Sequence, residues 1–432
     1  MIKTEFPINK QLEDPYLDAM NFLNEISIIN PEAISFASGR PDEDFFNVEE
    51  VIAGYPNFLH EYYNENWTYK RALGDLGQYN KTNGIINDAI SKLIKNDENI
   101  DSKPEDIVVT NGAQEGMCIL INTLIDSEDD ILMVSDPSYI GFVGYAKIFG
   151  TSIASIKRDE DSIDLEHLEQ TIIQLKKEGK NPKVLYEVVD YHNPTGQYMP
   201  LDKRKKILEL AEKYNFLIIE DNPYGYFSYC KEKNPVLKAL DTNKRVIYLG
   251  SFSKTLFPSL RLGYLVIDQE VEHNGKIVKL VDECKKVKSF TTVNTTTILQ
   301  AMAGAVLLDQ NYSLKTYCKK MIAAYKDKRD EMLRALEYYF YNVHKLDNIV
   351  TWAEPDGGFF LTIEIPFQID DDLLLKCVRD YSVIFCPINY FHIDKKEGRN
   401  KIRLAFSNVP VYKIEQGISQ LALFVKDHID IQ

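Results

Sequence analysis

The chain has 432 residues, of which 44% are hydrophobic, 11% aromatic and 27% charged, a composition typical of a soluble globular protein. Its formal net charge of −15 argues against nucleic acid as the main partner, because phosphate backbones attract clustered Lys and Arg. No apolar run approaches the length of a membrane span, and residues 1–18 lack the apolar core of a signal peptide, so we expect a cytoplasmic protein that contacts no membrane.

The six cysteines are widely spaced along the chain, and no two of them form a CxxC pair. This spacing argues against a zinc knuckle or a dense disulfide framework. We therefore expect a reducing compartment and no metal site.

In chain order, short apolar segments alternate with longer segments of helical periodicity. The apolar segments predict strands at residues 107–110, 131–134, 184–188, 216–219, 246–249 and 263–267. Strands that are apolar almost throughout are typical of a sheet covered by helices on both faces, so we expect an α/β core. Helical spacing predicts helices at 115–125, 165–176, 201–214 and 312–341, with an irregular arm before about residue 60 and a smaller strand-and-helix unit from Gly357 onwards.

Polar residues follow the predicted strands, and in open α/β sheets ligands bind beyond the carboxyl ends of strands. After the first strand, the turn at Gly112, Ala113 and Gln114 opens a helix whose free N–H groups could hold a phosphate. A plain strand-to-helix turn is the alternative. Tyr139 follows the second strand and would bring an aromatic ring to the same edge, although a lone tyrosine there usually packs in the core.

The next two strands are followed by an amide, a carboxylate and a phenol. Asn193 lies in an Asn-Pro turn after residues 184–188, and Asp221 and Tyr224 follow residues 216–219. Each could be only a turn or capping residue. The functional interpretation has all three side chains directed into one cleft.

The segment SFSKTLFPSLR, residues 251–261, supplies two hydroxyls, an amine and a guanidinium after the strand at 246–249. Ser251, Ser253 and Arg261 suit a phosphate, because Arg offers a fork of donors and hydroxyls complete the shell. Lys254 is then an amine beside a bound anion. Together with the earlier strand ends, the order is phosphate turn, ring, amide, carboxylate with phenol, and amine with a second phosphate cluster.

These motifs resemble those of the class I/II aminotransferases, which are fold type I enzymes dependent on pyridoxal 5'-phosphate (PLP). The resemblance runs from residues 34–39 to residues 403–407, and ISFASGRPDEDFF and PDGGFFLTIEIP are most similar to the 2-aminoadipate and kynurenine aminotransferases. It implies a large domain with a mostly parallel seven-stranded sheet between helices, plus a smaller α+β domain. The implied parts are an N-terminal arm with part of the small domain (1–60), the PLP-binding domain (61–310), and a connecting helix with the small domain (311–432).

The resemblance also implies roles for individual residues. Lys254 would hold PLP as an internal aldimine and shuttle the proton, and Asp221 would pair with the pyridine nitrogen. Tyr224 and Asn193 would form hydrogen bonds with the ring oxygen, and Tyr139 would stack on the ring. The phosphate would be held by Ala113, Gln114, Ser251, Ser253, Arg261 and, from a neighbouring subunit, Tyr79, which implies a homodimer with shared active sites.

Substrate contacts are implied at Arg403, which matches the arginine that binds the α-carboxylate, assisted by Asn193 and the Gly39 backbone. A structural salt bridge is the alternative for Arg403. Arg40 stands where the subgroup usually has an apolar residue, and it either binds an anionic substrate group or pairs with Asp42, Glu43 or Asp44. Ala113 in place of a serine, residues 79–81 and residues 386–389 also depart from the pattern of the subgroup, so substrate and reaction type stay open.

Three hypotheses for function follow from these motifs. The first is a ping-pong aminotransferase that moves an amino group from an L-amino acid to a 2-oxo acid. The second is another PLP-dependent reaction, by a lyase, cyclase or oxidase of a specialised pathway, because the cofactor residues would be the same. The third is a regulator with an aminotransferase-like sensor domain, which we disfavour because Gly39 comes too early to leave room for a preceding DNA-binding domain.

Overall fold

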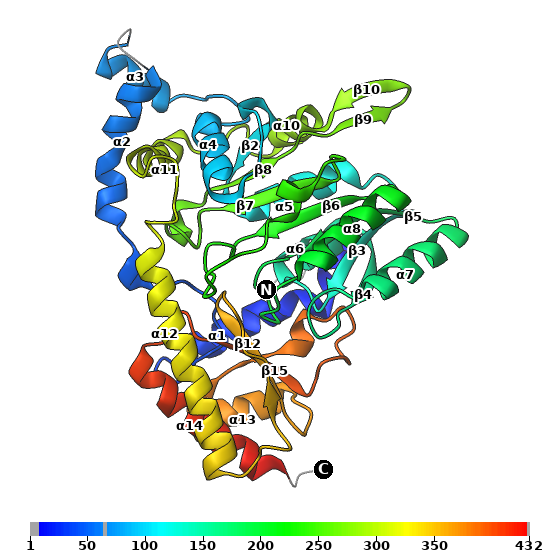
Figure 1. The fold of residues 1–432 in the computed structure, drawn as a ribbon, viewed down its shortest axis with the longest axis vertical. Coiled ribbons are helices and arrows are strands. Elements are labelled where there is room, and N and C mark those ends of the chain that lie inside the picture. Colours follow the sequence, from blue (N-terminus) through cyan, green and yellow to red (C-terminus); the bar gives the residue numbers. More distant parts are fainter. Residues whose placement is uncertain (1–7, 64–66, 430–432) are drawn as a thin grey trace, which may run out of the picture.

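A computed structural model describes residues 8–63 and 67–429 (Figure 1). A larger body built on a seven-stranded sheet lies above a smaller one, and the long helix α12 (Lys319–Leu336) runs down one side. Within the described ranges, no helix combines the length and apolar character needed to cross a membrane.

The large sheet confirms the predicted α/β class. Its strand order is β2-β8-β7-β6-β5-β3-β4, and only β8 runs antiparallel to its neighbours among the described strands. The strands are β2 (Ile107–Thr110), β3 (Asp130–Asp136), β4 (Ser152–Lys157), β5 (Asn181–Glu187), β6 (Leu217–Asn222), β7 (Val246–Ser251) and β8 (Gly263–Val266).

Strand β4 was not predicted from the sequence, whereas the other six strands were. Its sequence, Ser-Ile-Ala-Ser-Ile-Lys, has no continuous apolar run, and Ile156 is the only fully buried residue of this strand. The reason is its position, because β4 lies at the edge of the sheet and, among the described strands, pairs with β3 alone. An edge strand needs less apolar surface than a strand covered on both faces.

Alternate residues of the central strands pack on opposite faces of the sheet, as the period of a strand requires. On β3, Ile131 and Met133 join a core with α7 (Leu165–Lys177) and α8 (Leu201–Tyr214). Leu132 and Val134 join the other core, which includes residues of α5 (Gly112–Leu124) and α6 (Ile140–Phe149). The helices α4 (Asn87–Glu98), α9 (Leu237–Leu240), α10 (Leu280–Thr291) and α11 (Thr297–Asp309), with the hairpin β9 (Glu270–His273) and β10 (Lys276–Lys279), complete this body.

The expectation of an irregular arm before residue 60 was wrong. The segment contains α1 (Ala19–Ile29) and α2 (Val48–Tyr63), and α3 (Tyr69–Leu76) follows. Gly54 and Pro56 lie within α2 and obscure its helical pattern. Tertiary packing overrides them, because α2 lies so close to α11 that a Cβ on Gly54 would be 3.1 Å from that of Ala305.

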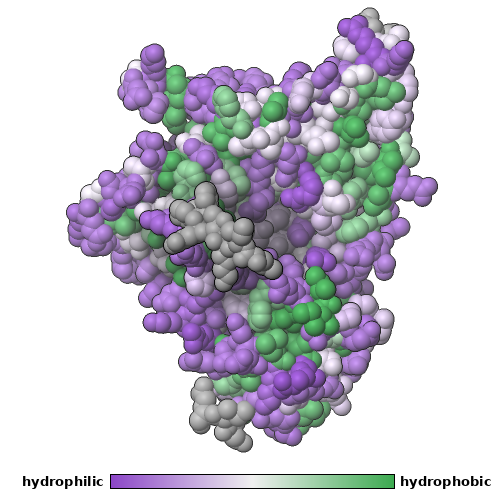
Figure 2. All heavy atoms as spheres, turned by 180° about the vertical axis from the view of Figure 1, so that it is seen from behind, coloured by the Kyte–Doolittle hydropathy of each residue, from purple (hydrophilic) through white to green (hydrophobic). Residues whose placement is uncertain are grey.

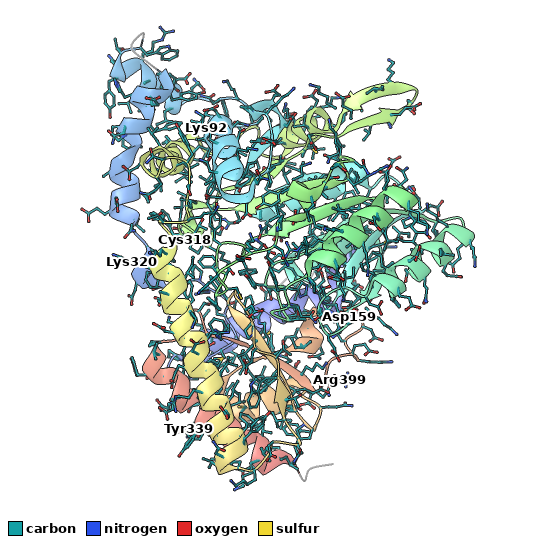
Figure 3. The ribbon with its side chains drawn as sticks, in the orientation of Figure 1. Lys92, Asp159, Cys318, Lys320, Tyr339 and Arg399 are labelled. Atoms are coloured by element: carbon teal, nitrogen blue, oxygen red, sulfur yellow. The ribbon has the colours of Figure 1, made fainter. Side chains whose placement is uncertain are left out.

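The predicted helix at 312–341 is shorter than expected at its start. Asn311 and Tyr312 both have positive φ, which interrupts helical geometry, and α12 begins only at Lys319. A π-helical segment, Glu337–Val343, continues it. Cys318, which precedes α12, and Tyr339, within the π-helical segment, are labelled in Figure 3.

The smaller body holds a four-stranded antiparallel sheet in the order β11-β12-β15-β14. Its strands are β11 (Thr351–Trp352), β12 (Phe360–Glu364), β14 (Cys386–Pro387) and β15 (Lys401–Ala405), and α13 (Asp371–Tyr381) and α14 (Val411–His428) pack with it. A short parallel pair, β1 (Ile34–Ser35) with β13 (Val383–Ile384), attaches the early chain to this body. The division of the chain at residues 60 and 310 stays a prediction.

Candidate active site

A cavity of about 340 Å³ lies at the carboxyl edge of the large sheet. The reverse face of the molecule is hollowed near its middle, and most side chains around the hollow are hydrophilic (Figure 2). All the predicted site residues except Tyr79 line this one cavity: Gly39, Arg40, Ala113, Gln114, Tyr139, Asn193, Asp221, Tyr224, Ser251, Ser253, Lys254, Arg261 and Arg403.

Lys254 provides a buried amine in this cavity. Its Nζ donates a hydrogen bond to the carbonyl of Gly39 at 3.0 Å, and no Asp or Glu of the described residues pairs with it. Burial, reinforced by the cations Arg403, Arg40 and Arg261, lowers the pKa of Lys254 to about 8. A substantial share of the amine is therefore neutral, and nucleophilic, at mildly alkaline pH.

Asp221 provides a buried carboxylate with one free oxygen. Its Oδ2 accepts a hydrogen bond from the Tyr186 hydroxyl at 2.6 Å, whereas Oδ1 has no partner among the described residues. Burial raises the pKa of Asp221 to about 7, and the bond from Tyr186 opposes that rise. A cationic N–H group bound in the cavity would satisfy Oδ1 and restore the charged form.

The turn at the start of α5 and the Arg261 side chain form a cradle for an anion. Gly112 has a φ of +75°, and a Cβ there would lie 2.5 Å from Nη2 of Arg261. The guanidinium thus packs directly on the backbone at a helix N-terminus, where N–H groups and the helix dipole favour negative charge. Ser251 and Ser253 line the same wall, and within the described ranges no carboxylate pairs with Arg261.

Two aromatic side chains bound the space between the cradle and Asp221. Gly141 makes room for the ring of Tyr139, since a Cβ there would lie 2.7 Å from it. Burial raises the pKa of Tyr139 to about 12 and that of Tyr224 well above its usual range, so both phenols stay protonated and can donate hydrogen bonds. Tyr224 is held edge-on by Phe359 and Phe360.

Arg403 reaches the cavity from β15 of the smaller body. Its Nη1 donates to Oδ1 of Asn193 at 2.7 Å, its Nη2 donates to the carbonyl of Ala37, and its Nε has no partner among the described residues. The guanidinium also lies between the rings of Phe360 and Phe391. In the part of the chain that the structure describes, no Asp or Glu pairs with it, so the structural salt bridge considered as its alternative is absent.

Two predicted site residues are arranged differently. Tyr79 is 78% exposed and lies outside the cavity of its own chain. Arg40 lines the cavity and forms no ion pair with Asp42, Glu43 or Asp44, and Asp42 pairs instead with Lys328 at 2.6 Å. The pairing alternative for Arg40 is therefore absent from the structure.

Several residues that line the cavity, and one that supports it, were not predicted from the sequence. Leu23, Asn24 and Ser27 on α1 and Phe360 on β12 line the cavity. The spacing of residues 23, 24 and 27 is that of one helix face, a signal that was lost because the segment was interpreted as irregular. Tyr186 was counted only as part of an apolar strand, although a tyrosine in such a strand needs a partner for its hydroxyl.

Comparison with known proteins gives the family. The family model described as "Aminotransferase class I and II" matches residues 37–421. The chain is 37% identical to (S)-3,5-dihydroxyphenylglycine transaminase of Amycolatopsis orientalis over 97% of this chain and 93% of that protein, and 29% identical to the mitochondrial kynurenine/alpha-aminoadipate aminotransferase of Mus musculus over 92% of each. The crystal structure of Pyrococcus horikoshii kynurenine aminotransferase superimposes with a TM-score of 0.84 at 29% identity, over 98% of both chains. The chain belongs to the class I and II aminotransferase family.

Proposed function

We propose that this aminotransferase binds PLP in the cavity and moves an amino group from an L-amino acid to a 2-oxo acid. The observation that carries the proposal is the presence, in one cavity, of a buried amine of lowered pKa (Lys254) and a buried carboxylate with an unpartnered oxygen (Asp221). When bound, PLP supplies a ring that accepts electrons from the substrate.

The lining residues suit each part of that cofactor. The phosphate would lie against the α5 N-terminus, Ser251, Ser253 and Arg261. Gln114 would contribute its backbone, because its side-chain amide already donates to the carbonyl of Gly141 at 2.7 Å. Asp221 would pair with the ring nitrogen, and Tyr139 would stack on the ring. Tyr224 and Asn193 would form hydrogen bonds with the ring oxygen.

The remaining groups suit the substrate. Arg403 would bind the α-carboxylate with its fork of donors, on an arm already oriented by Asn193 and two aromatic rings. Lys254, in its neutral form, would act as the general base that takes the proton from the α-carbon. Its protonated form would then act as the general acid that gives the proton back. The carbonyl of Gly39 would hold the protonated form of the amine in the interval.

The first prediction concerns the half-reaction. Mixing the PLP-loaded enzyme with an accepted L-amino acid, without any 2-oxo acid, is expected to convert the cofactor absorbance to that of the pyridoxamine form, with one 2-oxo acid released per site. A 2-oxo acid should then restore the first spectrum, and double-reciprocal plots of the complete reaction should be parallel. The D-enantiomer of the same donor is the control. Release of ammonia from the donor without the pyridoxamine spectrum would contradict transamination and favour the lyase alternative.

We also propose a homodimer that contains Tyr79 in its interface. Thr297 on α11 donates to the carbonyl of Leu76, so the exposed side chains of Tyr79, Val293 and Ile298 extend from neighbouring segments. Figure 2 shows hydrophobic side chains gathered along the α2 side of the molecule. Exposed apolar surface of this kind is typical of protein interfaces.

The six cysteines are free, which supports the proposal of a reducing, cytoplasmic location.

The dimer is tested by mass in solution. Sedimentation is expected to give twice the chain mass for the native protein, and a shift towards one chain mass for Ile298→Asp, because a buried charge weakens an apolar interface. Ile277→Asp is the matched control, since Ile277 is 76% exposed on the β9–β10 hairpin, away from this surface. A native protein of single-chain mass at all concentrations would contradict the proposal.

A further inference from the structure

We propose that Lys288 and Glu115 form a buried ion pair that positions the phosphate cradle and cancels a negative charge beside it. Both are positioning residues, because they lie behind the cradle and do not line the cavity. The inference rests on the proposed PLP site. It concerns the affinity of the protein for the phosphate group of the cofactor, not the transfer of the amino group.

The pair joins the end of α10 to the start of α5. Nζ of Lys288, on α10, lies 3.0 Å and 2.9 Å from the two carboxylate oxygens of Glu115, in the first turn of α5. The Lys288 side chain is completely buried. Thr292, just after α10, donates to the same carboxylate and accepts a hydrogen bond from Lys288 at 3.1 Å. Each of the three side chains therefore contacts the other two.

Glu115 also shapes the turn that leads into the cradle. Its Oε2 accepts the backbone N–H of Asn111 at 2.6 Å, so the side chain reaches back over the turn in the manner of a capping box. The side chain of Asn111 itself does not cap the helix. The backbone N–H groups of the first turn, at Ala113 and Gln114, are therefore left for an anion.

An unpaired carboxylate at this position would oppose phosphate binding. A negative charge in the first turn of α5 interacts favourably with the helix dipole, but it repels an anion bound at the same N-terminus. Lys288 is the only basic side chain among the described residues that pairs with Glu115, and it brings the net charge of the pair to zero. Burial lowers the pKa of Lys288, and the carboxylate opposes that decrease and so favours the charged amine.

Three variants separate the charge of the pair from its geometry. Lys288→Met leaves the carboxylate without its cation, so the pair becomes negative. Glu115→Gln keeps an acceptor for the N–H of Asn111, and the pair is then neutral or positive. The double variant keeps the same acceptor and carries neither charge. A role in charge cancellation predicts that only Lys288→Met weakens phosphate binding.

The experiment titrates the cofactor-free full chain at pH 8 with PLP and with pyridoxal, which lacks the phosphate, and follows the cofactor absorbance. The ratio of the two affinities measures the contribution of the phosphate without any turnover. We expect Lys288→Met to reduce this ratio by about tenfold or more, the size expected when unit charges interact across a partly buried site. Glu115→Gln should not reduce it, and the double variant should return it to within about threefold of the native value.

Lys286→Met is the matched control, because Lys286 lies on the same helix and its exposed side chain pairs with Glu283 at 2.7 Å. It should keep the native ratio. An unchanged ratio in Lys288→Met, or a loss that the double variant does not restore, would overturn the inference. If Lys288→Met does not fold, the other two variants decide, since a ratio reduced about tenfold in both would also overturn it. A native protein that binds PLP no more tightly than pyridoxal would instead contradict the phosphate site of the proposed function, and the inference with it.

Discussion

Replacing Lys254 by alanine is expected to reduce the rate of amino transfer by roughly 10²–10⁴-fold, the range associated with loss of a general acid–base group. The variant should also lose the covalent adduct that borohydride reduction leaves between PLP and the protein. The physical reason is the environment of this amine, which is buried, unpaired with any described carboxylate and surrounded by three arginines that favour its neutral form. The adduct is measured by mass spectrometry of the peptide that contains residue 254, and the rate by stopped-flow absorbance.

Two other buried lysines show why Lys254 should be the site of attachment. Lys288 pairs with Glu115 at 2.9 Å and Lys328 pairs with Asp42 at 2.6 Å, so each of these amines has a carboxylate partner, although burial still lowers the pKa of Lys288. The exposed Lys157, replaced by alanine, is a control that should keep both the adduct and the rate. Recovery of the adduct on Lys288 or Lys328 in the native protein would contradict the assignment of Lys254.

Replacing Asp221 by asparagine is expected to reduce amino transfer by about 10²–10³-fold, the usual cost of removing one preorganised electrostatic group from an active site. The fold should not suffer, because Asn at this position keeps an acceptor for the Tyr186 hydroxyl and removes a buried charge whose second oxygen has no described partner. A stable variant with little activity would separate the chemical role of Asp221 from a structural one. Equal losses of activity and of stability would contradict that separation.

The same substitution has a pH dependence in the cofactor-free protein. Burial raises the pKa of Asp221 from its ordinary value near 3.8 to about 7. Between these values the folded state holds more protons than the unfolded state, so the native protein loses stability relative to Asp221→Asn as the pH rises from 4 to 7. Above pH 7, this pH-dependent loss in the free energy of unfolding, relative to the variant, approaches an upper limit of about 4 kcal/mol, since each pKa unit corresponds to about 1.36 kcal/mol.

Urea unfolding of both cofactor-free proteins at pH 4 and pH 8 measures this difference. The advantage of Asp221→Asn should be larger at pH 8. Addition of PLP at pH 8 should then stabilise the native protein more than the variant, because a ring N–H would pair with Oδ1 only when the carboxylate is charged. An advantage that does not change with pH would show that Asp221 has an ordinary pKa in the folded protein.

Local patterns in the sequence were sufficient for the core of the fold. Strands that are buried on both faces must be apolar almost throughout, and this requirement identified β2, β3, β5, β6, β7 and β8. The helices α7 and α8 were likewise predicted from their apolar spacing. The same reasoning failed for β4, an edge strand with less to bury, and for α2, whose Gly54 and Pro56 are tolerated because the helix packs on α11.

That the polar residues of the site meet in one cavity was predictable for a related reason. Parallel strands end at one edge of a sheet, so polar residues that follow successive strands meet there, and Asn193, Asp221 and Lys254 do line one cavity. Their roles in catalysis stay predictions. The exposed Tyr79 stays a prediction as well, since its proposed partner belongs to another subunit.

The sequence by itself therefore determined six of the seven strands of the large sheet and the polar residues that gather at its carboxyl edge, because each depends on residues close together along the chain. Only the tertiary structure decided how those groups are tuned. The bond from Tyr186 to Asp221 spans 35 residues, that from Arg403 to Asn193 spans 210, and that from Lys254 to Gly39 spans 215. Contacts at such separations leave no periodic signal in the sequence, since they arise when helices and strands pack against one another.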